Sequence, residues 1–236
     1  MQVPELPETG AFRLGRAPAA ETAHERVYRH ISYMLMAGFF QPGETISLRQ
    51  LSSALHVSEM PVRNALNRLI AESAIELLPN RQTRIPTLDR GQFDELTRVR
   101  LMLETDIAAD AYRRATRGDI DELEAINAKL VEAIGRGETQ KSIDCNQRFH
   151  LSFYAIAGRP LTFSLITNVW LRAGAFMHAV LRSDLITWRA SYHDALIRAL
   201  RLKNLDACVQ AIRDDIIETH KEIVGLPAGV IFPAEA

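Results

Sequence analysis

The sequence predicts a mainly α protein with two parts, an N-terminal winged helix-turn-helix and a C-terminal all-α antiparallel helical bundle. Three observations support this fold class. Residues 46–71 contain two short amphipathic segments joined by a tight polar turn, and residues 74–87 have the pattern of a hairpin. Beyond residue 90 the chain is a succession of helical segments with short connections, and we find no convincing strand there.

The paired segments at 46–71 have the form of a helix-turn-helix. The first segment carries apolar residues on one side, namely Leu48, Leu51, Ala54 and Leu55. Ser58 suits an N-cap, and Pro61 is tolerated in a first helical turn. The second segment repeats apolar residues at helical spacing, at Val62, Ala65, Leu66, Leu69 and Ile70. We therefore predict a recognition helix at 59–71.

The opposite face of that helix is polar. It presents side chains that can hydrogen-bond base edges and phosphates, namely Arg63, Asn64, Asn67 and Arg68. An ordinary helical hairpin with a solvated outer face is the alternative. The neighbouring segments favour DNA binding, because a long helix at about 20–37 precedes the pair and a hairpin with Arg81 near its tip follows it.

Charge limits how this part of the chain can bind DNA. The whole chain has 28 Lys and Arg against 29 acids, so it is not a polycation. Residues 21–90 hold eight Arg and seven acids, a net of +1, and all four Lys lie later in the chain. The few Arg side chains must therefore share one face, and non-specific affinity should be modest and sensitive to salt.

Composition also suggests where the protein works. Cys145 and Cys208 have no motif spacing, so reduced thiols in a cytoplasmic protein are the default expectation. The N-terminus lacks an apolar signal core, and no apolar run approaches membrane-spanning length. Residues 1–19 are rich in proline and glycine and are expected to form a flexible arm.

The domain boundaries follow from these patterns. We predict a winged helix-turn-helix at 20–88, a helical domain at 89–226 and a tail at 227–236. The helical domain should contain six helices, at about 91–117, 119–135, 138–157, 160–182, 186–202 and 204–224. Their short connections fit an antiparallel bundle.

A group of potential metal ligands lies in the predicted bundle. Asn146 and His150 are four residues apart and share a helix face, while His193 and Asp215 fall on two later helices. Imidazole nitrogen and carboxylate oxygen are good ligands for zinc and similar ions, and the Asn carbonyl is a weaker one. The alternative is that the histidines are surface residues or hydrogen-bonded core residues.

Several motifs in sequence order resemble a known family. The string Ser58-x-x-Pro61-Val62-Arg63-x-Ala65-Leu66-x-Arg68-Leu69 resembles the GntR family of bacterial transcription regulators. The second half resembles the all-helical effector domain of its FadR subfamily, called FCD. The motifs that carry this second resemblance are Val99–Glu104, Asn146–His150, Gly158–Leu161, His193 and Asp215.

The resemblance implies roles for particular residues in DNA binding. Arg49 and Arg63 correspond to residues that contact DNA in the family. Glu59 stands where the family usually has Arg, which puts the operator preference in doubt. The tip of the wing, Asn80-Arg81-Gln82, lacks the usual Gly.

The resemblance also implies a ligand site in the helical domain. Many relatives hold a divalent metal, and the corresponding set is Asn146, His150, His193 and Asp215. We expect zinc there, with nickel as an alternative. The effector should be a small organic acid bound against Arg100, with Arg148 and His178 as further candidates. A salt bridge from Arg100 to Glu104 is the competing interpretation.

The resemblance implies a cytoplasmic homodimer that binds a pseudo-palindromic DNA operator and most often acts as a repressor. Two alternatives stay open. One is a pure metal sensor, and the other is a metal-dependent hydrolase with a DNA-binding arm. The hydrolase is disfavoured because we find no dedicated acid–base pair near the ligand set, so we expect no enzyme activity.

Overall fold

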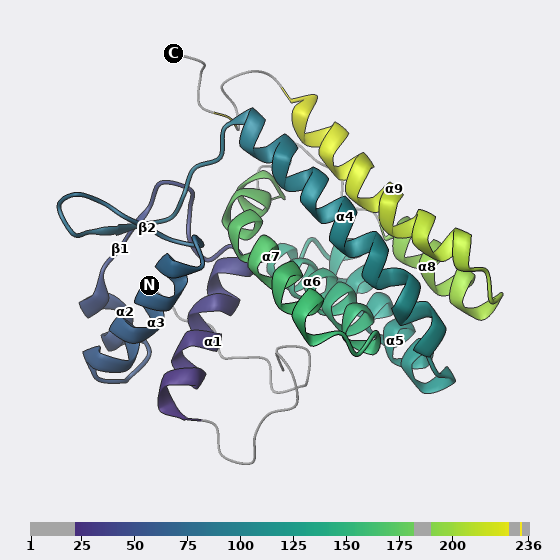
Figure 1. Cartoon of the computed structure of the whole chain (residues 1–236), viewed down its shortest axis with the longest axis horizontal. Helices are drawn as coiled ribbons and strands as arrows, with labels where there is room; N and C mark the ends of the chain where they lie inside the picture. Colours follow the sequence, from purple (N-terminus) through teal and green to yellow (C-terminus); the bar gives the residue numbers. More distant parts are fainter. Residues whose placement is uncertain (1–21, 182–189, 227–231, 233–236) are drawn as a thin grey trace. The chain divides into compact units, whose positions relative to one another are not determined.

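Nine α-helices and three short β-strands make up the described part of the computed structural model, residues 22–181, 190–226 and 232 (Figure 1). The predicted mainly α fold class is confirmed. The predicted arm at 1–19 lies outside the described residues, as does the predicted tail apart from Phe232. Among the described residues, no helix is both long and apolar enough to cross a membrane.

The described residues form two compact units. The first contains residues 22–88 together with Trp170–Ala179, and the second contains Asp89–Val169 together with residues 180–181, 190–226 and 232. The predicted boundaries did not include this contribution of a later segment to the first unit.

The first unit begins with a three-helix core. Its elements are α1 (Ala23–Met36), β1 (Thr45–Ile46), α2 (Leu48–Ala54), α3 (Glu59–Ala71), β2 (Glu76–Leu77) and β3 (Thr83–Arg84). A capping box between Thr22 and Glu25 starts α1. Helix α1 packs on α3, and Ile31 and Leu35 of α1 and Leu69 of α3 are completely buried. Burial of these side chains is the main source of the unit's stability.

A small antiparallel sheet completes the winged helix-turn-helix. Its strand order is β1-β3-β2, with Thr45 opposite Arg84 and Leu77 opposite Thr83. The sequence predicted the β2–β3 hairpin but not β1, because a strand of two residues is too short to show alternation. Ser58 stands at the N-cap of α3 as predicted, although its side chain makes no capping hydrogen bond.

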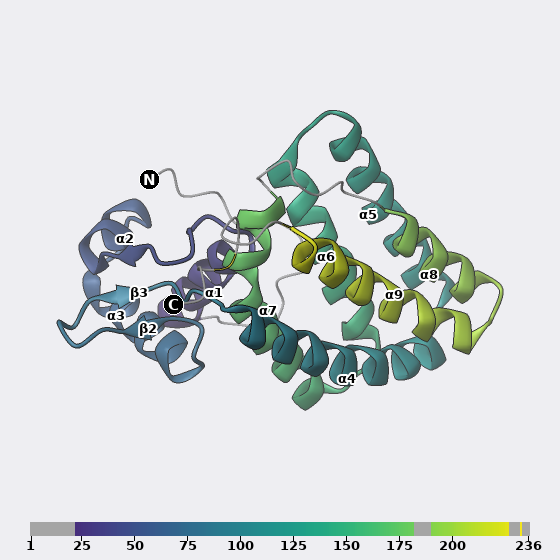
Figure 2. The ribbon, with the colours of Figure 1, turned by 90° about the horizontal axis from the view of Figure 1, so that it is seen from above.

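The second unit is a bundle of helices (Figure 2). Its elements are α4 (Arg90–Arg114), α5 (Arg117–Gly135), α6 (Thr139–Ile156), α8 (Ser191–Arg201) and α9 (Leu205–Val224), with the first part of α7 (Pro160–Leu181). Helix α5 packs along α6, and α9 packs along both α4 and α8. Capping boxes at Asp89 and Thr116 begin α4 and α5. The predicted bounds differ by a few residues at most, except that 186–189 lie outside the described residues.

The later part of α7 belongs to the first unit, where it crosses α1. A Cβ atom at Gly174 would lie 2.7 Å from the Cα of Met36 and 2.8 Å from the carbonyl oxygen of Leu35. Only glycine allows the two backbones to approach this closely.

Candidate DNA-binding surface and ligand site

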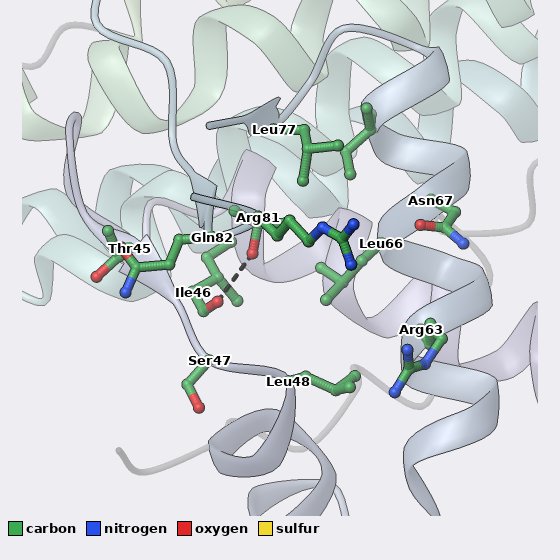
Figure 3. Close-up of a pocket in the computed structure, with 12 residues that line it drawn as sticks. Thr45, Ile46, Ser47, Leu48, Arg63, Leu66, Asn67, Leu77, Arg81 and Gln82 are labelled. Atoms are coloured by element: carbon green, nitrogen blue, oxygen red, sulfur yellow. Dashed lines mark hydrogen bonds between the residues drawn. The ribbon is translucent and has the colours of Figure 1, made fainter. Parts of the chain in front are cut away.

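A hollow of about 360 Å³ lies between α3 and the wing formed by β2 and β3 (Figure 3). Its lining contains both polar and apolar side chains. The lining residues are Thr45, Ile46, Ser47, Leu48, Arg63, Leu66, Asn67, Ile70, Leu77, Arg81, Gln82 and Thr83. The hollow thus brings together residues of β1, α2, the recognition helix α3 and the wing.

Three of the predicted DNA-binding residues line this hollow. Arg63 and Asn67 lie one turn apart on α3, and Arg81 extends from the wing toward α3 (Figure 3). Arg81 has a φ of 65°, a left-handed conformation in which glycine is more usual. The turn is held without glycine, because the amide of Gln82 donates to Asn80 Oδ1 at 3.1 Å and that of Arg81 donates to the Leu78 carbonyl at 2.8 Å.

Two other predicted DNA-binding residues lie on the flank of α3 that faces α1. Asn64 Nδ2 lies 3.4 Å from His24 Nδ1. The Arg68 guanidinium stacks 3.6 Å from the centre of the Tyr28 ring and donates to Glu72 at 2.9 Å. These contacts give Arg68 a role in holding α1 to α3. Its contact with DNA stays a prediction.

Tyr28 and Glu72 complete that flank. The Tyr28 hydroxyl donates to Glu72 Oε2 at 2.6 Å. Burial, together with the Glu72 carboxylate, raises the pKa of Tyr28 to about 12, so the hydroxyl keeps its proton. Arg49, in contrast, is exposed on the first turn of α2, where its side chain is accessible to a DNA backbone.

The second candidate site lies inside the helical bundle. His150 on α6, His193 on α8 and Asp215 on α9 offer ligand atoms that all lie within 4.8 Å of one another. His150 Nε2 is 3.0 Å from His193 Nε2 and 3.5 Å from Asp215 Oδ2. Both histidines are only 2% exposed. Three residues that are far apart in the sequence therefore converge on one point.

Each histidine has a hydrogen-bond partner at its other ring nitrogen, Nδ1. His193 Nδ1 lies 3.1 Å from Asn127 Oδ1, and the Asn127 amide nitrogen donates to Asp194 at 2.7 Å. Because the Asn127 oxygen can only accept, the proton of His193 belongs on Nδ1. His150 Nδ1 lies 3.4 Å from the Tyr154 hydroxyl, which donates its own proton to Glu104 at 2.6 Å. The Phe149 ring stacks on His193 with centroids 3.8 Å apart.

Burial keeps both histidines uncharged and makes Asp215 easier to protonate. Desolvation, helped by the Arg100 charge, lowers the pKa of His150 to about 3, and desolvation lowers the pKa of His193 well below its usual range. Desolvation raises the pKa of Asp215 to about 7, although Arg100 opposes this rise. Neutral imidazoles are the form that binds a metal ion.

Arg100 forms the predicted alternative salt bridge. Its Nε donates to Glu104 Oε1 at 2.7 Å, and the Glu104 side chain is 1% exposed. Burial opposes the charge of Arg100, but Glu104 raises its pKa overall. The Arg100 charge also acts on His150 and Asp215, so it lies within electrostatic range of the cluster.

The remaining predicted site residues are Asn146, Arg148 and His178. Asn146 is half-buried, one turn before His150 on α6. Arg148 lies on the other side of α6 from His150, because residues two apart on a helix are turned by about 200°. His178 belongs to α7, but its side chain lies outside the described residues. His220 instead pairs with Asp94 at 2.7 Å.

Sequence reasoning missed Asn127, Tyr154 and Gln147. Gln147 is 3% exposed, and neither its Oε1 nor its Nε2 has a hydrogen-bond partner among the described residues. Polar residues at buried positions of amphipathic helices are a weak signal for all three, because only the packing shows which residues they face.

A winged helix-turn-helix ahead of an all-helical domain defines a DNA-binding transcription regulator. The FCD domain family matches residues 95–218, and the bacterial regulatory proteins of the gntR family match residues 23–85. The chain therefore belongs to the GntR family of regulators and carries an FCD domain. The resemblance found in the sequence is confirmed.

Two relatives are transcription regulators rather than enzymes. The HTH-type transcriptional regulator McbR of Escherichia coli (strain K12) is 29% identical over 187 residues, which cover 78% of this chain and 84% of McbR. The gluconate operon transcriptional repressor of Bacillus licheniformis is 22% identical over 211 residues, which cover 85% of each protein.

Solved structures of GntR regulators have a similar fold. E. coli McbR/YncC has a TM-score of 0.79 at 25% identity and covers 86% of this chain and 100% of its own. A GntR regulator from Rhodococcus sp. RHA1 has a TM-score of 0.70 at 19% identity, covers 86% of this chain and 98% of its own, and supports the fold alone.

Proposed function

We propose that this chain is a dimeric repressor whose operator binding is controlled by a small organic acid bound beside a divalent metal in the helical domain. The convergence of His150 Nε2 and His193 Nε2 at 3.0 Å is the observation that carries the ligand part of this proposal. Repression is supported by a relative, since the B. licheniformis protein is named a repressor.

The hollow between α3 and the wing supports the DNA-binding part. Arg63 and Asn67, which line it, would meet base edges in a major groove, and Arg81 would meet a phosphate or the minor groove. Arg49 should contact the backbone from α2. Arg63→Ala should weaken operator binding by about tenfold or more, as expected for a lost base contact.

The metal is supported by the protonation pattern of the cluster. Asn127 and the Tyr154 hydroxyl take up the Nδ1–H groups, so both Nε2 lone pairs are directed at the same point. Two facing lone pairs repel each other unless a cation or a proton lies between them. His150, His193 and Asp215 would hold the ion, with Asn146 as a weak fourth partner.

A bound divalent ion would supply positive charge and an open position for an oxygen of the effector. Glu104 already offsets Arg100, and Asp215 offsets one charge of the ion. The site would therefore keep one net positive charge, which an organic acid would neutralise. The unpaired amide of Gln147 lies on the same side of α6 as His150 and offers both a donor and an acceptor to such a ligand.

A dimer is supported by exposed apolar side chains on two antiparallel helices. Met102 of α4 is 68% exposed, and Leu161 and Leu165 of α7 are 75% and 45% exposed. Arg159 ties the start of α7 to α4 through Asp106 at 2.6 Å. Exposed apolar side chains that lie together are typical of interfaces, whereas a single exposed one such as Leu202 is common on any surface. Leu165→Glu should yield monomers in sedimentation, whereas Leu202→Glu, at a 72% exposed residue of the α8–α9 turn, should not.

The control of operator binding is tested by titrating operator complexes with a panel of organic acids, with and without zinc. We expect release by an acid in the zinc-loaded protein and no release in the His193→Ala variant. Release or tightening by zinc alone would favour the metal sensor instead. No response to any acid or metal would contradict the proposal.

A further inference from the structure

Glu59 is an acid at the start of the recognition helix, on the side that carries Arg63. Its carboxylate lies 3.8 Å from Arg63 Nη2, beyond hydrogen-bonding distance, and the two side chains are 54% and 59% exposed. The acid at the other end of this helix differs, because Glu72 accepts hydrogen bonds from both Tyr28 and Arg68. Glu59 is therefore available to another partner.

An acid in this position is unfavourable for DNA binding in general. Glu59 would face the phosphates that Arg63 attracts, which lowers non-specific affinity. An exposed ion pair at i,i+4 adds little to stability, and an acid in the first helical turn adds a similarly small amount. These small gains do not explain why the acid stands on the DNA-facing side.

The major groove offers one partner that suits a carboxylate well. Cytosine presents its N4 amino group there as a donor, and Glu accepts from it. Guanine presents two acceptors and thymine presents an acceptor and a methyl group, so both would leave the carboxylate without a partner. Adenine places an acceptor beside its donor. A carboxylate thus selects cytosine chiefly by excluding the other bases.

We propose that Glu59 is a specificity-determining residue that accepts a hydrogen bond from the N4 amino group of a cytosine in each operator half-site. Arg63, one turn further along α3, donates to a nearby guanine. The loose contact between the two side chains in the free protein leaves each of them able to turn to its base. This inference rests on the proposed role of α3 as the recognition helix.

The experiment starts with selection of operators from a random-sequence double-stranded DNA library by the full-length protein. Binding is then measured for the selected operator and for copies with each base pair replaced, using the native protein, Glu59→Ala and Arg63→Ala. Glu95→Ala is the charge control, because it removes an exposed acid from the second unit.

For the native protein and Glu95→Ala, we expect replacement of one cytosine per half-site to weaken binding about tenfold or more. Glu59→Ala should bind random DNA more tightly yet discriminate at that position by about twofold or less. N4-methylcytosine, which blocks the amino hydrogen in the major groove, should weaken native binding as strongly as a base change and leave Glu59→Ala unaffected.

Two results would overturn the inference. Glu59→Ala could keep every base preference and bind all sequences more tightly, which would mean that Glu59 only weakens DNA binding in general by electrostatic repulsion. Alternatively, Glu59→Ala could lose discrimination only at the guanine that Arg63→Ala affects, which would make Glu59 a support for Arg63. If Arg63→Ala also left every base preference unchanged, α3 would not be the recognition helix. Failure of the inference about Glu59 can therefore be told apart from failure of the proposed DNA-binding role of α3.

Discussion

Replacing Arg100 by methionine should destabilise the helical domain strongly, in spite of similar side-chain size. Arg100 donates to Glu104, whose side chain is 1% exposed, and the variant would leave that carboxylate buried with the Tyr154 hydroxyl. Breaking a buried ion pair by removing one partner costs about 3–5 kcal/mol. At roughly 2–4 °C per kcal/mol for a protein of this size, the melting temperature should fall by about 6–20 °C.

The assay is thermal unfolding followed by circular dichroism, with Arg100→Met/Glu104→Gln as the matched control. The double variant removes both charges and keeps an oxygen that can accept from Tyr154, so it should recover most of the lost stability. It also separates stability from effector binding, because a stable double variant that ignores the acid would place the Arg100–Glu104 pair at the ligand. A melting temperature of Arg100→Met equal to that of the native protein would refute the buried-pair argument.

Three further outcomes follow from the structure. Burial raises the pKa of the Cys208 thiol to about 12 and also raises the pKa of the Cys145 thiol. A thiol reagent should therefore modify Cys145 slowly in the folded protein and Cys208 only on unfolding. Early labelling of Cys208 would contradict this. Gly174→Ala should cost about 1–3 kcal/mol in urea unfolding, whereas Gly135→Ala, with no atom within 4 Å of the new Cβ, should cost nothing; equal effects would refute the close crossing. The pKa values of the two cluster histidines in the folded protein lie below the ordinary 6.5, so below that pH the unfolded chain binds more protons than the folded one. The metal-free protein should therefore lose stability as the pH falls from about 6.5 to 5. Asp215, with its pKa raised to about 7, opposes that loss of stability, so Asp215→Asn should make the loss steeper. A shallower loss of stability in Asp215→Asn would contradict the raised pKa of Asp215.

Much of the fold could be predicted from the sequence, because helical periodicity and end signals are local. The recognition helix is found at Glu59–Ala71, as the apolar spacing and Ser58 predicted. Strand β1 could not be predicted, since two residues carry no period and the strand exists only by pairing with β3. The contribution of α7 to the first unit could not be predicted either. In the sequence Gly174 looks like any other glycine in a helix, and only the structure shows that α7 crosses α1 there.

The ligand residues of the candidate metal site could be predicted from the sequence, but their surroundings could not. His150, His193 and Asp215 were identified from residue type and resemblance, and the structure brings them together within 4.8 Å. Their hydrogen-bonding partners were not identifiable, because Asn127 and Tyr154 face the cluster only after five helices have packed. Burial of the cluster, and hence the direction of its pKa shifts, depends on the same packing.

The central claim is that the helical domain holds a divalent metal at this cluster. The most direct test is elemental analysis of the full-length protein purified without chelator, compared with His193→Ala and with His220→Ala. His220 is the matched control, because it pairs with Asp94 outside the cluster. We expect about one divalent ion per chain in the native protein and in His220→Ala, and close to none in His193→Ala. Equal metal content in all three proteins would contradict the claim.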